Sequence, residues 1–142
     1  MKFDILGPLA GLDRRSAISW LVLRVLLATF IAAHGWARLI AGGVVPFGGW
    51  LEGQGIPAGL IVASAITMIE IIGTPLLALG RLVPLLSMIY SCIYLVGIFL
   101  VHLPAGWFVV GLGRNGAEYS VLLIACLVLV GIQHQKRDEN IL

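Results

Sequence analysis

The chain has 142 residues, of which 60% are hydrophobic and only 11% are charged, and its formal net charge is +2. A soluble domain carries roughly 25% charged residues, and the mean hydropathy here is +1.05, so there are too few polar side chains to cover a soluble globule. The basic residues are scattered along the sequence, which argues against a nucleic-acid-binding face. The composition therefore predicts an all-α membrane protein that has the lipid bilayer as its solvent and partner.

The first apolar run covers residues 17–40 and is long enough to cross a bilayer. It follows a segment, 1–16, that contains several charged side chains, and we expect that segment at the cytoplasmic surface. A cleaved signal peptide is the competing interpretation, because basic residues also precede such peptides. Arg24 lies in the middle of the run, where the apolar core of a signal peptide would not tolerate it. A retained helix is therefore favoured.

Residues 41–57 are rich in glycine and contain two prolines. Glycine and proline disfavour a continuing helix, while the phenylalanine and tryptophan in this segment suit the membrane interface. We therefore expect a re-entrant or surface-lying loop. The second and third spans cover residues 58–79 and 82–101, and Gly80 and Arg81 make a tight turn between them.

A loop from His102 to Glu118 separates the third span from the fourth, which covers residues 117–132. A polar tail, 134–142, follows and is expected in the cytoplasm. The four spans predict a single membrane domain, residues 17–133, that folds as an antiparallel bundle of four transmembrane helices.

Lysine and arginine near the ends of the spans predict the orientation, because they are enriched on the cytoplasmic side. Arg38 and Arg114 lie on one side of the membrane and six basic residues lie on the other, so both termini are expected in the cytoplasm. The segment 41–57 and the loop from His102 to Glu118 then share the outer face. The six basic residues on the cytoplasmic side are Lys2, Arg14, Arg15, Arg81, Lys136 and Arg137.

Two charged residues lie deep inside apolar spans, at a cost of about 2.5–3.5 kcal/mol each on insertion scales. At a rise of 1.5 Å per residue, Arg24 lies about 10 Å and Glu70 about 15 Å from the cytoplasmic side. An ion pair between neighbouring antiparallel helices would avoid two uncompensated charges, so we predict that Arg24 and Glu70 pair or share a polar network. The alternative is that Arg24 snorkels to the interface and Glu70 is protonated.

Polar residues also gather at the predicted outer ends of the helices. His34 and His102 end two helices that run in the same direction, so they should lie at similar depth. We predict an outward-facing polar pocket in which His102, Glu118 and His34 are the catalytic, proton-transferring residues. The competing interpretation is that these groups cap helix ends and bridge the outer loop. The residues predicted to bind ligand in or below this pocket are Arg24, Glu70, Arg38 and Trp107.

Metal and cofactor motifs are absent from the sequence. A metal ion or a haem between His34 and His102 is less favoured, because the chain has no close H-x-x-H or E-x-x-H spacing. Cys92 and Cys126 lie inside apolar runs and form no C-x-x-C or C-x-x-C-H motif. We interpret them as small packing residues, although their similar depth leaves a redox pair open. Any electron donor must therefore be a partner or a substrate.

Several motifs occur in an order that resembles the DoxX family, over about residues 17–131. Arg38 stands where the family commonly has lysine, and Ala105 stands where it commonly has asparagine, so the match is divergent. The motifs are Arg24 in the first span, His34-Gly-Trp-Ala-Arg38-Leu at its end, Glu70 followed by Gly73 and a Leu-Gly-Arg turn, His102-Leu-Pro-Ala-Gly-Trp-Phe, and Gly-Ala-Glu118-Tyr.

The resemblance implies a small four-helix membrane protein. Members include a subunit of a thiosulfate:quinone oxidoreductase and a partner in a membrane-associated oxidoreductase complex that handles thiol and oxidative stress. Related four-helix proteins have been linked to the chaperoning or assembly of other membrane proteins.

We therefore expect a membrane subunit of a redox system, in which the polar pocket accepts a quinone or passes protons. Oxidation of thiosulfate, sulfur or thiols is the reaction that the resemblance implies. A non-catalytic accessory or assembly subunit is the rival hypothesis. A small-solute transporter is a third, although four helices would need to oligomerise to form a path. The expected location is a bacterial or archaeal cytoplasmic membrane, with a partner subunit or a second copy of the chain.

Overall fold

The computed structural model describes residues 12–138, with side chains through His134. This part of the chain is helical and contains no strand. Most of the predicted N-terminal segment and the end of the predicted tail, 139–142, lie outside the described residues. The helices are α1 (Arg14–Ile40), α2 (Val44–Gly53), α3 (Gly59–Ala78), α4 (Val83–Gly97) and α5 (Glu118–Asp138), and α4 continues as a π-helical turn (Ile98–His102) and a short 3-10 helix (Leu103–Ala105).

Three helical segments are long and apolar enough to cross a membrane: α1, α3, and α4 together with its extension to Ala105. The apolar part of α5, Glu118–His134, is shorter. The all-helical architecture confirms that part of the prediction, and the fourth span remains an expectation. The turn between α3 and α4 is also as predicted, because Gly80 takes a positive φ of 76° that lets the chain reverse within a few residues.

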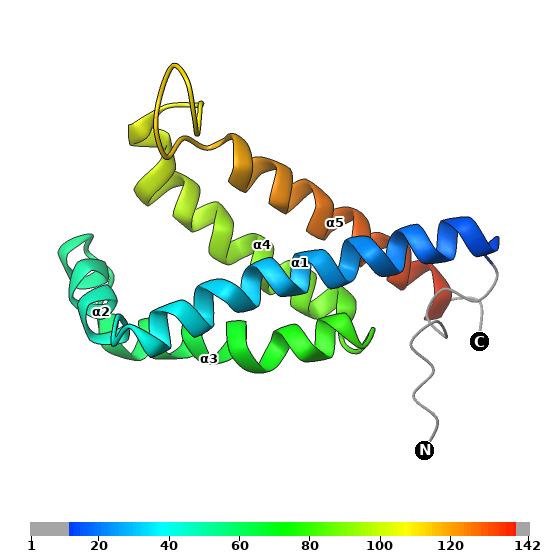
Figure 1. Ribbon diagram of the computed structural model, residues 1–142. Helices are drawn as coiled ribbons and strands as arrows, with labels where there is room; N and C mark the ends of the chain where they lie inside the picture. Colours follow the sequence, from blue (N-terminus) through cyan, green and yellow to red (C-terminus); the bar gives the residue numbers. More distant parts are fainter. Residues whose placement is uncertain (1–11, 139–142) are drawn as a thin grey trace.

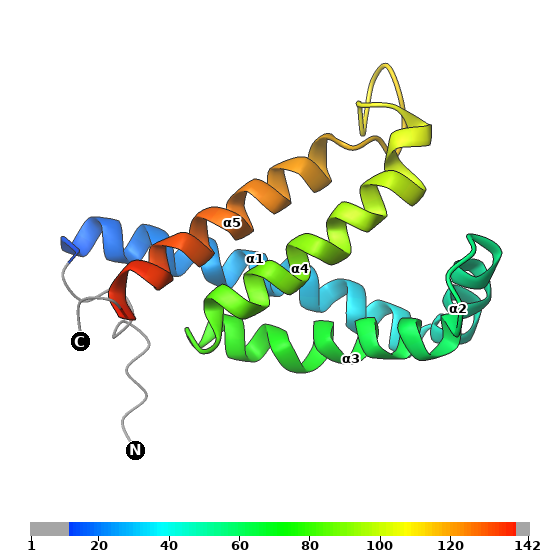
Figure 2. The same ribbon diagram turned by 180° about the vertical axis from the view of Figure 1, so that it is seen from behind.

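The long helices form two antiparallel hairpins (Figures 1 and 2). α1 packs along α3, and α4 packs along α5. The hairpins meet at the end that holds the α3–α4 turn, which we call the turn end, and they diverge toward the end that holds α2 and the α4–α5 loop, which we call the loop end. The predicted bundle is therefore splayed, with its helices converging only at the turn end.

The buried core lies where the two hairpins meet. It draws on α1 through Leu27 and Ile31, on α3 through Leu77, on α4 through Tyr90 and on α5 through Leu127, all of which are nearly or fully buried. Because one apolar cluster draws on four helices, it holds the two hairpins together at this end. The polar side chains described below lie toward the loop end, outside this cluster.

The glycine-rich segment contains a helix, α2, where a loop was expected. Gly48 lies against the backbone of α3, and a Cβ there would come within 2.7 Å of the Leu60 Cα. Glu52 accepts a hydrogen bond from the Gly59 N–H at 3.1 Å and so caps the start of α3. The loop prediction was wrong because Gly48 and Gly59 permit α2 and α3 to pack closely, which outweighs the low helix propensity of glycine.

Two helix ends also lie beyond the predicted span limits. α1 begins at Arg14, because the Asp13 carboxylate accepts hydrogen bonds from the backbone N–H groups of Arg15 and Ser16. α5 runs to Asp138 instead of stopping near residue 132. His134, which was assigned to the polar tail, is therefore a helical and buried residue.

Candidate functional site

An ion pair between Arg38 of α1 and Glu70 of α3 forms the centre of a polar cluster toward the loop end. Arg38 Nη1 donates to Glu70 Oε2 at 2.6 Å and to Thr67 Oγ1 at 3.1 Å. The Glu70 side chain is only 4% exposed, whereas that of Arg38 is 19% exposed. The glutamate of the pair is thus buried, whereas the arginine is partly accessible from outside the protein.

Close approach of α1 and α3 makes this pair possible. Gly35 faces α3, and a Cβ at this position would lie 2.8 Å from the Glu70 Cβ. Small residues of this kind let membrane helices approach one another. Thr67 and Thr74 satisfy their own hydroxyls by donating to backbone carbonyls one turn earlier in α3, so they add polarity beside Glu70 without leaving an unpaired group.

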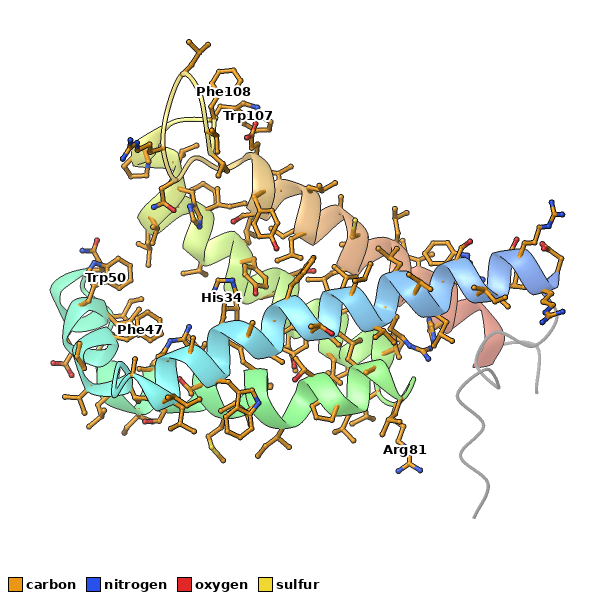
Figure 3. The ribbon with its side chains drawn as sticks, viewed as in Figure 1. His34, Phe47, Trp50, Arg81, Trp107 and Phe108 are labelled. Atoms are coloured by element: carbon orange, nitrogen blue, oxygen red, sulfur yellow. The ribbon has the colours of Figure 1, made fainter. Side chains whose placement is uncertain are left out.

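One face of the arginine lies against an aromatic side chain of α2. The Arg38 guanidinium carbon lies 4.6 Å from the centre of the Phe47 ring, in a cation–π contact. Phe47 in turn stacks on Trp50 with ring centres 6.0 Å apart and an interplanar angle of 15°. Figure 3 shows both rings on the side of α2 that faces His34. Sequence reasoning placed Phe47 and Trp50 at the interface but missed the contact of Phe47 with Arg38, because that contact depends on the unpredicted helix α2.

His34 lies one helical turn before Arg38 and is solvent- or lipid-exposed. It interacts electrostatically with Glu70, and Figure 3 shows it projecting from α1 on the side of α4. Tyr94 of α4 also lies within electrostatic range of Glu70 and Arg38, and its buried hydroxyl bonds to no described residue. The cluster therefore places an exposed imidazole beside a largely buried ion pair.

Arg24 does not pair with Glu70, so that prediction was wrong. Arg24 is fully buried, and its Nη1 lies 2.7 Å from Nε2 of His134 in α5. Arg24 and Arg38 are 14 residues apart on α1, or about 21 Å along its axis, which places Arg24 far from the Arg38–Glu70 pair. The sequence estimate of depth was too coarse to choose between two arginines on one helix. His134 was missed because it was assigned to the tail.

His102, Glu118 and Trp107 lie in and around the α4–α5 loop, away from the ion pair. His102 Nδ1 lies 2.8 Å from the Asn115 carbonyl oxygen, and Glu118 Oε1 accepts the Val109 N–H at 3.0 Å. The structure thus does not bring His102 and Glu118 into contact. Each side chain instead bonds to a backbone group of the α4–α5 loop. Trp107 is 54% exposed at the loop (Figure 3).

The two cysteines are free thiols, with Cys92 exposed and Cys126 partly buried. Among the side chains that the structure describes, residues 12–134, no group of three or more histidine, cysteine, aspartate or glutamate residues is placed to hold a metal ion. The chemistry that the described cluster offers is therefore hydrogen bonding, charge stabilisation and proton exchange.

Long apolar helices with a polar cluster toward one end define a small, all-helical integral membrane protein. The DoxX family profile matches residues 19–103, well over half of the chain, and the protein belongs to the DoxX family. The match covers α1 to α4, including Arg24, His34, Arg38, Glu70 and His102, but neither the α4–α5 loop beyond residue 103 nor α5. No curated protein sequence and no solved structure matches the chain.

Proposed function

We propose that this protein is the membrane subunit of a redox system and that the cluster around Arg38, Glu70 and His34 receives a quinone. The observation that carries the proposal is the Arg38–Glu70 pair, held at 2.6 Å between apolar helices with an exposed histidine one turn away. Ionisable groups in such helices are costly and commonly mark sites of binding or proton transfer. Family membership supports the redox assignment, because some DoxX proteins belong to quinone-linked oxidoreductase systems.

The residues of the cluster fit a quinone headgroup. Arg38 bonds through Nη1, and no described residue bonds its Nε or Nη2, so these N–H groups can donate to a carbonyl oxygen. The stacked rings of Phe47 and Trp50 offer flat apolar surface beside the guanidinium. A bound quinone would supply the electron acceptor. His34 would deliver the protons that accompany reduction, and the electrons would come from a partner subunit or from a sulfur or thiol substrate.

Binding of a short-chain ubiquinone to the purified full chain tests this proposal, with quenching of tryptophan fluorescence as the readout. Arg38→Gln should weaken quinone binding about tenfold or more, because it removes a charged hydrogen-bond donor and leaves Glu70 without its ion-pair partner. His34→Asn should retain most of the affinity. Arg114→Gln, in the α4–α5 loop, is the matched control and should bind as the wild type does. Equal affinity of wild type and Arg38→Gln would overturn the proposal.

A second candidate function is a non-catalytic accessory or assembly subunit. The α4–α5 loop favours it, because His102 and Glu118 bond to the loop's own backbone and the loop presents exposed apolar side chains, with Val110 at 80% and Leu112 at 89% exposure. An apolar loop that is held in place by such hydrogen bonds is suited to docking a partner protein. Alanine at His102 or Glu118 separates the candidates: an enzyme should lose turnover and keep its partner, whereas an accessory subunit should lose the partner.

We also propose that the turn end faces the cytoplasm of a bacterial or archaeal cell. Arg14, Arg15 and Arg81 lie at this end, as Figure 3 shows for Arg81, and basic residues are enriched on the cytoplasmic side. The polar cluster would then open toward the outer face. Labelling a cysteine placed at Arg114 with a membrane-impermeant reagent in intact cells should succeed, and labelling one placed at Arg81 should fail.

A further inference from the structure

A groove of about 450 Å³ runs between α4 and α5, on helices that contribute little to the polar cluster. Its lining on α4 extends from Pro84 to Leu95, or about 16 Å along the helix axis. Apolar side chains form most of the surface, and no aspartate, glutamate, lysine, arginine or histidine lines it. The volume lies within the range of small-molecule sites, roughly 300–1,000 Å³.

Two serine hydroxyls in the lining have no hydrogen-bond partner among the described residues. Ser87 is 2% exposed, and its Oγ and that of Ser91 are buried without a bond. A serine or threonine inside a helix commonly donates to the carbonyl one turn earlier, as Thr67 and Thr74 do in α3. The two groove serines do not donate in this way. One turn of α4 therefore carries two hydroxyls without a hydrogen-bond partner among the described residues, beside an apolar groove.

The wall of α5 opposite Ser87 is a glycine. A Cβ at Gly131 would lie 3.2 Å from the Ser87 Cβ and 3.6 Å from its Oγ. Glycine at this position lets α5 pack directly against Ser87, and both residues line the groove. Cys92, which is exposed, lies in the same lining and gives a chemical handle on the groove.

We propose that the α4–α5 groove is a binding site for one uncharged acyl lipid whose carbonyl or hydroxyl group bonds to Ser87 and Ser91. The apolar lining and its length fit a hydrocarbon chain, and the absence of charged side chains excludes a charged headgroup from the lining. Ser87 and Ser91 lie about 6 and 12 Å along α4 from Val83, a depth that favours a lipid whose polar group is small. The site does not depend on the proposed function, because it shares no residue with the Arg38–Glu70 cluster.

Photolabelling of the full chain in nanodiscs tests the site. The experiment uses a Cys126→Ser variant, in which Cys92 is the remaining thiol. The probe is a diazirine-bearing diacylglycerol. Cross-links should concentrate on peptides 84–95 and 124–132, and excess unlabelled diacylglycerol should remove them. The double variant Ser87→Ala/Ser91→Ala should reduce labelling about tenfold, the effect expected from losing two hydrogen bonds. The control pair Ser19→Ala/Ser64→Ala lies outside the groove and should label normally.

Alkylation of Cys92 with N-phenylmaleimide is the second arm, and it decides the outcome should the double serine variant fail to fold. Filling the groove in this way should abolish the specific cross-links while the helical content stays unchanged. Cross-links that spread evenly over all lipid-facing helices, with no effect of the serines or of Cys92 alkylation, would overturn the proposal. So would a Cys92–Cys92 disulfide dimer that forms without lipid labelling, because a second copy of the chain would then occupy the groove.

Discussion

Arg24 of α1 and His134 of α5 share a hydrogen bond of 2.7 Å across 110 residues of sequence. The second ring nitrogen of His134 lies 3.0 Å from the Val130 carbonyl oxygen. A carbonyl oxygen can only accept, so Nδ1 carries the hydrogen, and an arginine can only donate, so Nε2 is the acceptor. His134 is therefore neutral in this arrangement, and it ties the first long helix to the last.

Replacing His134 tests the strength of this tie. His134→Ala removes the acceptor of a charged donor, and we expect the free energy of unfolding in detergent to fall by about 1.5–3 kcal/mol. His134→Gln supplies an amide oxygen at similar reach and should recover part of that loss. Gln133→Ala, at the neighbouring position, is the control and should change stability little. An alanine variant as stable as the wild type would contradict the assignment.

Gly35 should be intolerant of any side chain. Gly35→Ala places a Cβ 2.8 Å from that of Glu70, which forces α1 and α3 apart next to the Arg38–Glu70 pair. We expect a loss of about 1–3 kcal/mol in the free energy of unfolding, as for other overpacked sites, together with weaker quinone binding if the cluster is the site. Gly49→Ala in α2, whose Cβ would meet nothing within 4 Å, should be neutral. Equal loss in both variants would refute the packing explanation.

Glu118 offers a direct comparison between a structural and a chemical role. Glu118→Gln keeps an oxygen that can accept the Val109 N–H, so the loop should stay closed, whereas Glu118→Ala should expose that amide. Hydrogen exchange at Val109 should therefore accelerate in the alanine variant alone. A redox activity lost in Glu118→Gln, with exchange at Val109 unchanged, would instead show that the carboxylate acts as an acid or base.

Acid should loosen the first turn of α1. The pKa of Asp13 lies below its usual value of 3.8, chiefly because the Ser16 hydroxyl donates to the carboxylate, with further help from backbone N–H groups. A lowered pKa in the folded state means that the stabilising effect is complete above pH 3.8 and is lost as the pH falls through the lowered value. Hydrogen exchange of the Arg15 and Ser16 amides should rise in that acidic range. Asp13→Ala should show fast exchange at every pH.

The apolar runs by themselves determined that the protein is helical and belongs in a membrane. Burying a polar backbone in lipid requires internal hydrogen bonds, so long apolar segments with few charges leave helices as the natural outcome. The ordered motifs from Arg24 to His102 were also enough to indicate the DoxX family, which the profile match over residues 19–103 confirms. Glu70, His34 and Arg38 were marked as candidate functional residues, but the sequence paired Glu70 with Arg24 instead of Arg38.

The tertiary structure decided which of these polar groups meet. Periodicity and depth place a side chain on a face and at a height, but they carry no information on helix crossing or splay. Arg38 reaches Glu70 because Gly35 brings α1 against α3, and Arg24 reaches His134 because α5 continues past residue 132. The sequence also carried no sign of the helix α2, because glycine disfavours a helix in isolation and Gly48 becomes favourable only when it packs on α3. Pairing in a membrane bundle is set by such close contacts, which depend on residues far apart in the chain.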